Sequence, residues 1–302
     1  MNPIPAFRLN LVLAAALACA SAANAQGSAE VNSGNTVQVQ TGAMQSQKVN
    51  LGNVVRDAKA KAQTGNVVQV QAGALQKQDM NVGNASGRAS TDARVGNAVQ
   101  VQAGALNKQS LDIGNASDRG SAKASVGNAV QVQAGALNQQ GAAVGNASGN
   151  GKTDAAVGNL VQIQAGALNK QQANIGNASG NGQSQVRMGN AVQVQGGALQ
   201  MQSMNVGNAS GNGKAKVNVG GVTQVQGGAL NRQVANIGNA SGSGKTNVNV
   251  GQVVQVQGGV LNNQQVDIGN NSSGGTTNVS VGGVIQVQGG LLGNDKVRIG
   301  NR

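Results

Sequence analysis

Aromatic residues are almost absent from this 302-residue chain, which has no tryptophan, tyrosine or histidine and a single phenylalanine, Phe7. The only cysteine is Cys19, and the only prolines are Pro3 and Pro5. The rest of the chain therefore cannot form disulfides, Cys or His metal sites or histidine-based catalysis. It also lacks the rings on which nucleic-acid bases stack. Proline interrupts β-ladders, so its absence permits uninterrupted β-pairing.

The first 25 residues predict a secretory signal peptide. Arg8 provides a basic start, Leu11 to Ala20 form an apolar run, and Ala23 to Ala25 form a small-x-small cleavage site. The run is too short to span a bilayer, and no later segment is apolar enough, so we expect no membrane span. A lipoprotein with Cys19 as the lipidated residue is the alternative. Either reading predicts a secreted protein that is extracellular or at the cell surface.

Beyond residue 25 the chain carries 20 Lys and Arg residues against 9 Asp and Glu, a net charge of +11. This excess is compatible with polyanion binding, but we favour a solubilising role because the basic residues are scattered and form no dense stripe. We therefore expect no specific nucleic-acid partner. The few carboxylates do not recur at equivalent positions, so we expect neither an enzyme nor a metal or cofactor site.

One motif, Gly-Asn-x-Val-Gln-Val-Gln-x-Gly, recurs at a constant step of 31 residues. The step suits a stack of coils in register, since a fixed period of this length is typical of solenoids. We predict a signal peptide over 1–25, a lead-in over 26–33 and a nine-repeat solenoid over 34–302. The first glycines of the nine copies are Gly34, Gly65, Gly96, Gly127, Gly158, Gly189, Gly220, Gly251 and Gly282.

Two alternating segments in each repeat predict two main strands per coil. In the third copy, Val99 and Val101 alternate with Gln100 and Gln102, and a second alternating set follows the Ala-Gly-Ala turn. The fold class predicted is all-β: a parallel β-solenoid of about nine 31-residue coils, roughly 43 Å tall at a strand spacing of about 4.8 Å.

Two rows, one almost purely β-branched and one always aliphatic, are the expected inward positions of a thin core. The row in the first strand is Val37, Val68, Val99, Val130, Val161, Val192, Thr223, Val254 and Ile285. The row before the second Gly-Asn pair is Leu51, Val82, Ile113, Val144, Ile175, Val206, Ile237, Ile268 and Ile299.

Amide side chains recur at three positions that we predict to be stacking ladders. Stacked carboxamides can donate to and accept from each other, which stabilises in-register strands. Solvation alone would accept other polar residues in some copies, and none occurs. The first glutamine row is Gln38, Gln69, Gln100, Gln131, Gln162, Gln193, Gln224, Gln255 and Gln286. The second is Gln40, Gln71, Gln102, Gln133, Gln164, Gln195, Gln226, Gln257 and Gln288. The asparagine row is Asn53, Asn84, Asn115, Asn146, Asn177, Asn208, Asn239, Asn270 and Asn301.

The repeat resembles the curlins, the secreted bacterial subunits of curli amyloid fibres, whose repeats carry Gln-x-Gly-x-x-Asn between two short strands. Matching segments are Gln102 to Asn107, Gln133 to Asn138, Gln164 to Asn169, Gln226 to Asn231 and Gln257 to Asn262. The 31-residue period exceeds the low-twenties period of curlins, so the resemblance implies curlin-like architecture. It also implies export through the outer membrane, nucleated polymerisation and a role in biofilm matrix or adhesion.

We therefore predict a secreted, self-assembling subunit of an amyloid-like fibre. Its main partner would be another copy of itself, with dedicated secretion and nucleation partners. The alternative is a discrete, capped solenoid that displays a repetitive surface to polysaccharide or another cell-surface component. The last repeat bears on this choice, because Asp295, Lys296 and Arg298 place charge there and predict a C-terminal cap.

Overall fold

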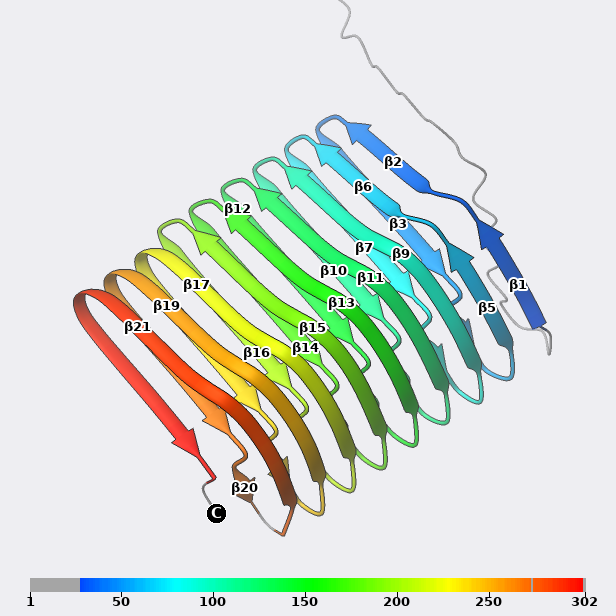
Figure 1. Cartoon of the computed structure of the whole chain (residues 1–302). Coiled ribbons are helices and arrows are strands. Elements are labelled where there is room, and N and C mark those ends of the chain that lie inside the picture. Colours follow the sequence, from blue (N-terminus) through cyan, green and yellow to red (C-terminus); the bar gives the residue numbers. More distant parts are fainter. Residues whose placement is uncertain (1–27, 273, 301–302) are drawn as a thin grey trace, which may run out of the picture.

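The protein is an all-β parallel solenoid of about nine coils, as the repeat predicts (Figure 1). The structure, a computed structural model, describes residues 28–272 and 274–300. The predicted signal peptide and Asn301 lie outside these residues. Each coil has a long strand in one layer and a return strand in the other, and successive coils lie side by side along the stack.

The strands repeat in the same order from coil to coil. The first three coils contain β1 (Ser28–Ser33), β2 (Thr36–Thr41), β3 (Met44–Leu51), β4 (Val54–Val55), β5 (Lys59–Thr64), β6 (Val67–Ala72), β7 (Leu75–Val82), β8 (Ala85–Ser86), β9 (Ser90–Ala103) and β10 (Leu106–Ile113). The middle coils contain β11 (Ser121–Ala134), β12 (Leu137–Val144), β13 (Lys152–Ala165), β14 (Leu168–Ile175), β15 (Gln183–Gly196) and β16 (Leu199–Val206). In the last coils the long and return strands are continuous, giving β17 (Lys214–Ile237), β18 (Ala240–Ser241), β19 (Lys245–Ile268), β20 (Asn271–Ser272) and β21 (Thr276–Ile299).

Every main pairing is parallel and joins residues that are 31 positions apart. Gln131 of β11 pairs with Gln100 of β9 and with Gln162 of β13, for example. Ser28–Ser33, within the segment predicted as a lead-in, form β1, which pairs in the same register with β5. The stack therefore begins before the first repeat motif.

Each long strand changes its inward face at the Gly-Asn pair. In β9, Ala93 and Val95 are buried, the next two residues face outward, and burial resumes at Ala98 and Gln100. Two consecutive outward residues reverse the alternation, as a β-bulge does. The prediction that the first-strand valine row points inward was therefore wrong. In this row Val37 is 41% exposed and Ile285 is 45% exposed, whereas the glutamines that alternate with it are buried in the inner coils.

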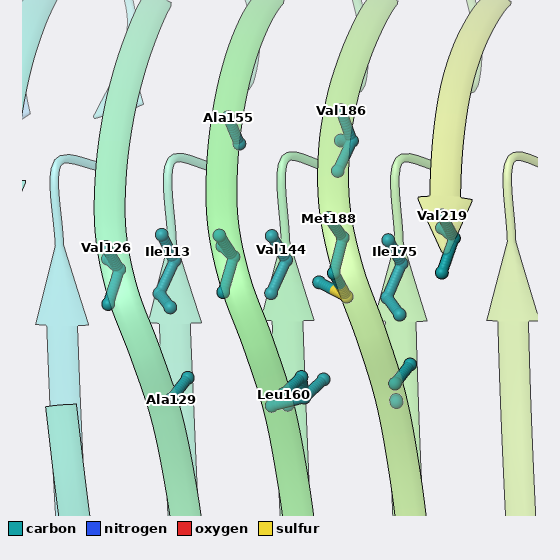
Figure 2. Packing of buried hydrophobic residues seen from close by; sticks show 14 of the residues in the cluster. Ile113, Val126, Ala129, Val144, Ala155, Leu160, Ile175, Val186, Met188 and Val219 are labelled. Carbon is teal, nitrogen blue, oxygen red and sulfur yellow. The ribbon is translucent and has the colours of Figure 1, made fainter. Parts of the chain in front are cut away.

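The interior has an apolar half next to the Gly-Asn corner. The row that precedes the second Gly-Asn pair is buried there from Leu51 to Ile268, while Ile299 in the last coil is exposed. Residues of the long strand, such as Val126, Leu160 and Met188, pack against Ile113, Val144 and Ile175 of the return strands (Figure 2). The other half of the interior, next to the Gln-x-Gly turn, is filled by amides.

The Gln-x-Gly turn brings the backbones of successive coils into close contact. A Cβ on Gly135 would lie 1.6 Å from the carbonyl oxygen of Gly104 in the preceding coil. Only glycine fits at this position, and the equivalent glycines of most other coils have the same constraint. The turn therefore sets how closely the coils stack.

Candidate functional site: the amide ladders and the ends of the stack

Glutamine carboxamides form continuous hydrogen-bonded ladders inside the stack. Gln131 is fully buried, and its Nε2 donates to Oε1 of Gln100 at 2.9 Å and to the backbone oxygen of Gly141 at 3.2 Å. Its own Oε1 accepts from Nε2 of Gln162 at 2.8 Å. The hydrogen bonds of this one side chain thus link three successive coils and both layers of the solenoid. Buried amides are tolerated here because their hydrogen-bonding groups have partners.

Three glutamine rows are built in this way. The rows of Gln38 and Gln40 extend inward from the long strands, and a third row, which the sequence repeats from Gln47 to Gln264 and breaks at Asp295, extends from the return strands toward them. Gln109, in the third row, donates to Oε1 of Gln78 at 3.0 Å and to the oxygen of Val132 at 3.1 Å. Carbonyl groups of each layer thus accept hydrogen bonds from amides of the other. In the first coil two of the rows are more accessible, with Gln38 half-buried and Gln40 exposed, whereas Gln47 of the third row is buried.

The ladders have a direction. In all three glutamine rows, Nε2 donates toward the preceding coil, as from Gln69 to Gln38 and from Gln286 to Gln255. The backbone carbonyl of the opposite layer, such as that of Gly141 for Gln131, fixes the orientation of the carboxamide. If the amide were flipped, its oxygen would face this carbonyl oxygen, and two acceptors would lie together. The N-terminal end of each row therefore points a donor nitrogen outward, and the C-terminal end of the first row points an acceptor oxygen outward.

The asparagine row lies at the corner between coils and caps backbone groups. Oδ1 of Asn115 accepts from the backbone nitrogen of Asn146 at 2.9 Å, and Nδ2 of Asn146 donates to the oxygen of Asn174 at 3.0 Å. The same pattern links the row from Asn53 onward to Asn270, whose backbone nitrogen donates to Asn239. This row therefore holds the corner in register.

An open groove follows this corner along the stack. It is lined by neighbouring rows of asparagine, alanine and serine, represented in the fifth repeat by Asn174, Asn177, Ala178 and Ser179. The lining offers amide and hydroxyl groups over a floor of buried alanines. Such a groove suits a neutral, extended ligand that is rich in hydroxyl groups.

The last coil interrupts two of the three glutamine rows. Asp295 takes the place of a glutamine opposite Gln264, and Oε1 of Gln264 is buried without a hydrogen-bond partner. Gln288 occupies the space where Gly293 lacks a side chain, and Oε1 of Gln257 is left without a partner as well. Asp295, Lys296 and Arg298 are all exposed. These charges are therefore on the surface of a coil that is poorly joined to the amide interior.

Within the described residues, both ends of the stack have open sheet edges. Strands β1, β2 and β3 pair on one side only, with β5, β6 and β7. Strand β21 pairs only with β19. Unpaired strand edges of this kind are templates for the addition of further strands.

The outer rows vary in charge from coil to coil. Among the residues described, Asp112 has a clearly raised pKa: burial of its carboxyl group is the main cause, a hydrogen bond from Ser110 opposes it, and the charge of Asp79 adds to it. The residues described contain no cluster of three or more His, Cys, Asp or Glu side chains that could hold a metal ion. They also contain no helix long and apolar enough to cross a membrane.

Comparison with known proteins gives no family assignment: no protein-family model, curated protein or solved structure matches this chain.

Proposed function

We propose that the protein is a secreted structural subunit that stacks end to end with copies of itself into an extracellular, amyloid-like fibre. Its role would be mechanical and adhesive, in a biofilm matrix or at a surface. The observation that supports this most is the complementarity of the two ends. One end directs donor nitrogens outward from its glutamine rows, the other directs the acceptor Oε1 of Gln286 outward, and both have open sheet edges.

Continuing the 31-residue register across a junction makes specific contacts between copies. The first coil of one copy would place Gln38 on Gln286 of the next, about 4.8 Å apart along the stack. The ladder of the first row would then run on without a change of direction, whereas the side chain of Gln288 would have to turn back from the space beside Gly293 before the second row could continue to Gln40. The same register places Lys48 on Lys296, so two exposed like charges oppose growth at each junction.

A charge-exchange experiment tests this junction. Lys296→Glu and Lys48→Glu should each replace the repulsion with attraction and speed seeded fibre elongation roughly two- to fivefold at low salt. Carrying both changes in one chain recreates a like-charge pair, so the double variant should return toward the wild-type rate. Thioflavin fluorescence and electron microscopy would follow elongation.

Two results would contradict the proposal. One is the absence of fibres from all four proteins. The other is a double variant whose rate is the product of the single effects, which would show that Lys48 and Lys296 do not meet. Lys170→Glu is a matched control, since Lys170 is exposed in the fifth coil, away from either end.

A second candidate function is the binding of a linear polysaccharide. The corner groove favours it, because rows of Asn and Ser present evenly spaced neutral donors and acceptors along the stack. Ser148→Val and Ser179→Val should weaken sedimentation with insoluble glucans or chitin without affecting elongation. Unchanged sedimentation, or none by the wild type, would remove this candidate.

A further inference from the structure

The outer side of the glutamine-filled half is a flat apolar face. Its two outward rows are valine or isoleucine in every coil except for one threonine; we call these two rows the valine face. The first row is Val37, Val68, Val99, Val130, Val161, Val192, Thr223, Val254 and Ile285. The second is Val39, Val70, Val101, Val132, Ile163, Val194, Val225, Val256 and Val287.

This face reverses the usual distribution of side chains. In β13, Gln162 and Gln164 are buried at 0% and 1% exposure, whereas Ile163 between them is 37% exposed. Soluble strands normally bury the aliphatic side chains and expose the amides. The amides have hydrogen-bond partners inside, and among residues 28–272 and 274–300 no strand packs over the aliphatic rows outside. Contiguous apolar patches of this kind mark interaction sites.

A single exposed leucine row, from Leu75 to Leu292, is the other apolar outward row, and it begins the return strands. The outward rows that carry charge differ from the valine face. On the return strands, one outward row includes Lys108, Gln139, Lys170, Met201 and Arg232 in successive coils. Charge and residue type vary freely there, as they do on a solvated surface. The valine face has no charged residue in any coil, so two copies can approach through it although the chain is strongly basic.

We propose that the valine face binds the valine face of a second copy, so that two solenoids pack side by side. Two flat sheets with β-branched rows at the same spacing can interdigitate as a dry interface. Nine strands at about 4.8 Å by five residues at about 3.3 Å give about 700 Å² per copy. The total of about 1,400 Å² lies in the range of stable, specific interfaces.

This lateral pairing is independent of end-to-end stacking. It uses the side of the solenoid, and a pair that meets through the same patch on both copies is closed. Stacking at the ends is open and continues without limit. A soluble particle that contains two chains would therefore indicate lateral pairing through the valine face, whereas fibres would indicate end-to-end stacking.

The first test substitutes the face without disturbing the fold. Val130→Thr, Val161→Thr and Val192→Thr keep β-branching, and Thr223 shows that a coil accommodates threonine in this row. The triple variant should weaken the dimer at least tenfold in sedimentation equilibrium. The matched control, with Gln139→Thr, Lys170→Thr and Ser203→Thr on the return strands, should leave the dimerisation constant unchanged.

The second test locates the contact. Val161 lies in the fifth of nine coils, so in a fully overlapping pair it faces its counterpart if the two stacks run antiparallel, and Ile163 of the other copy if they run parallel. In a Cys19→Ser background, either Val161→Cys alone or a mixture of Val161→Cys and Ile163→Cys should form a disulfide-linked dimer on oxidation. Lys170→Cys, which is exposed on the opposite layer, should not.

Three outcomes would overturn the proposal. The wild type could remain a folded monomer at all concentrations, or the Thr triple and its control could dimerise equally well. The third is wild-type protein that co-sediments with phosphatidylcholine vesicles while the Thr triple does not, which would assign the face to a lipid surface.

Discussion

Replacing Gln131 with leucine should lower the free energy of unfolding by about 1–3 kcal/mol. The change removes the donor to Oε1 of Gln100 and to the oxygen of Gly141, and the acceptor for Nε2 of Gln162. A buried polar group without a partner costs about 1–3 kcal/mol. Nε2 of Gln162 keeps a contact with Gln172 at 3.4 Å, so the loss is concentrated at one or two groups. Two such groups, Oε1 of Gln100 and the oxygen of Gly141, cost about 4 kcal/mol at the middle of that range, and burial of the leucine offsets about 2 kcal/mol of this, which leaves the net loss of about 1–3 kcal/mol.

Glutamate at the same position should be more destabilising than leucine at neutral pH. A carboxylate has no donor for Gln100 or Gly141, and its charge would be buried between the layers. Burial raises the pKa of such a carboxyl group above its unfolded value. Stability of Gln131→Glu should therefore rise as the pH falls through the raised pKa, since the protonated acid can donate again.

Substitutions in adjacent coils distinguish a ladder from independent buried side chains. With leucine at Gln100, Gln131 and Gln162 together, the row is broken only at its two new ends, Oε1 of Gln69 and Nε2 of Gln193. The triple leucine variant should therefore cost less than the sum of three single variants. Three stacked glutamates should cost more than their sum, because like charges would lie about 4.8 Å apart.

Guanidinium unfolding of the purified soluble protein, followed by circular dichroism, measures these differences. Gln139→Leu and Gln139→Glu are the controls, because Gln139 is exposed on the return strand of the same coil and should tolerate both changes. Equal stability of the wild type and the Gln131 variants, or additive costs for the leucine series, would refute the ladder.

Three further predictions concern single positions. Gly135→Ala should lower the free energy of unfolding by at least about 3 kcal/mol, because the new methyl group overlaps the backbone of the preceding coil. Gly196→Ala, which has open space at its Cβ, should raise it by about 0.4–1 kcal/mol. Thermal unfolding of the two variants compares these effects. Asp112→Asn should raise stability at neutral pH, and the gain should vanish as the pH falls through the raised pKa of Asp112; equal gains at pH 3 and pH 7 would contradict this. Asp295→Gln should provide the hydrogen-bond donor that Oε1 of Gln264 lacks. The variant should therefore show more amide-exchange protection in the last coil and faster fibre elongation. Unchanged protection would show that the glutamine row does not continue into this coil.

Much of the fold follows from the sequence alone. The constant 31-residue step requires register between coils, and alternation in each copy requires strands. The row from Leu51 to Ile268 is buried as expected. Each of its residues is the last of a return strand, and inward and outward residues alternate along that strand without a bulge. The signal peptide, secretion and polymerisation remain predictions.

Alternation alone does not predict which face of the long strand points inward, because either the valines or the glutamines that alternate with them can occupy the inner side. The Gly96–Asn97 bulge reverses the phase within one strand, and the valines after it point outward. One signal in the sequence bears on the true orientation: the glutamines never vary, whereas outward rows such as that of Lys108 and Gln139 do.

The period, the strands and the identity of the residues that lie above one another can all be read from the sequence, since they depend only on spacing along the chain. That amides fill half of the interior and valines cover its outer side is evident only in the folded coil. The reason is that an amide can be buried only where the opposite layer supplies a carbonyl acceptor, as Gly141 does for Gln131. That partner belongs to another strand, so its position exists only once the coil has closed.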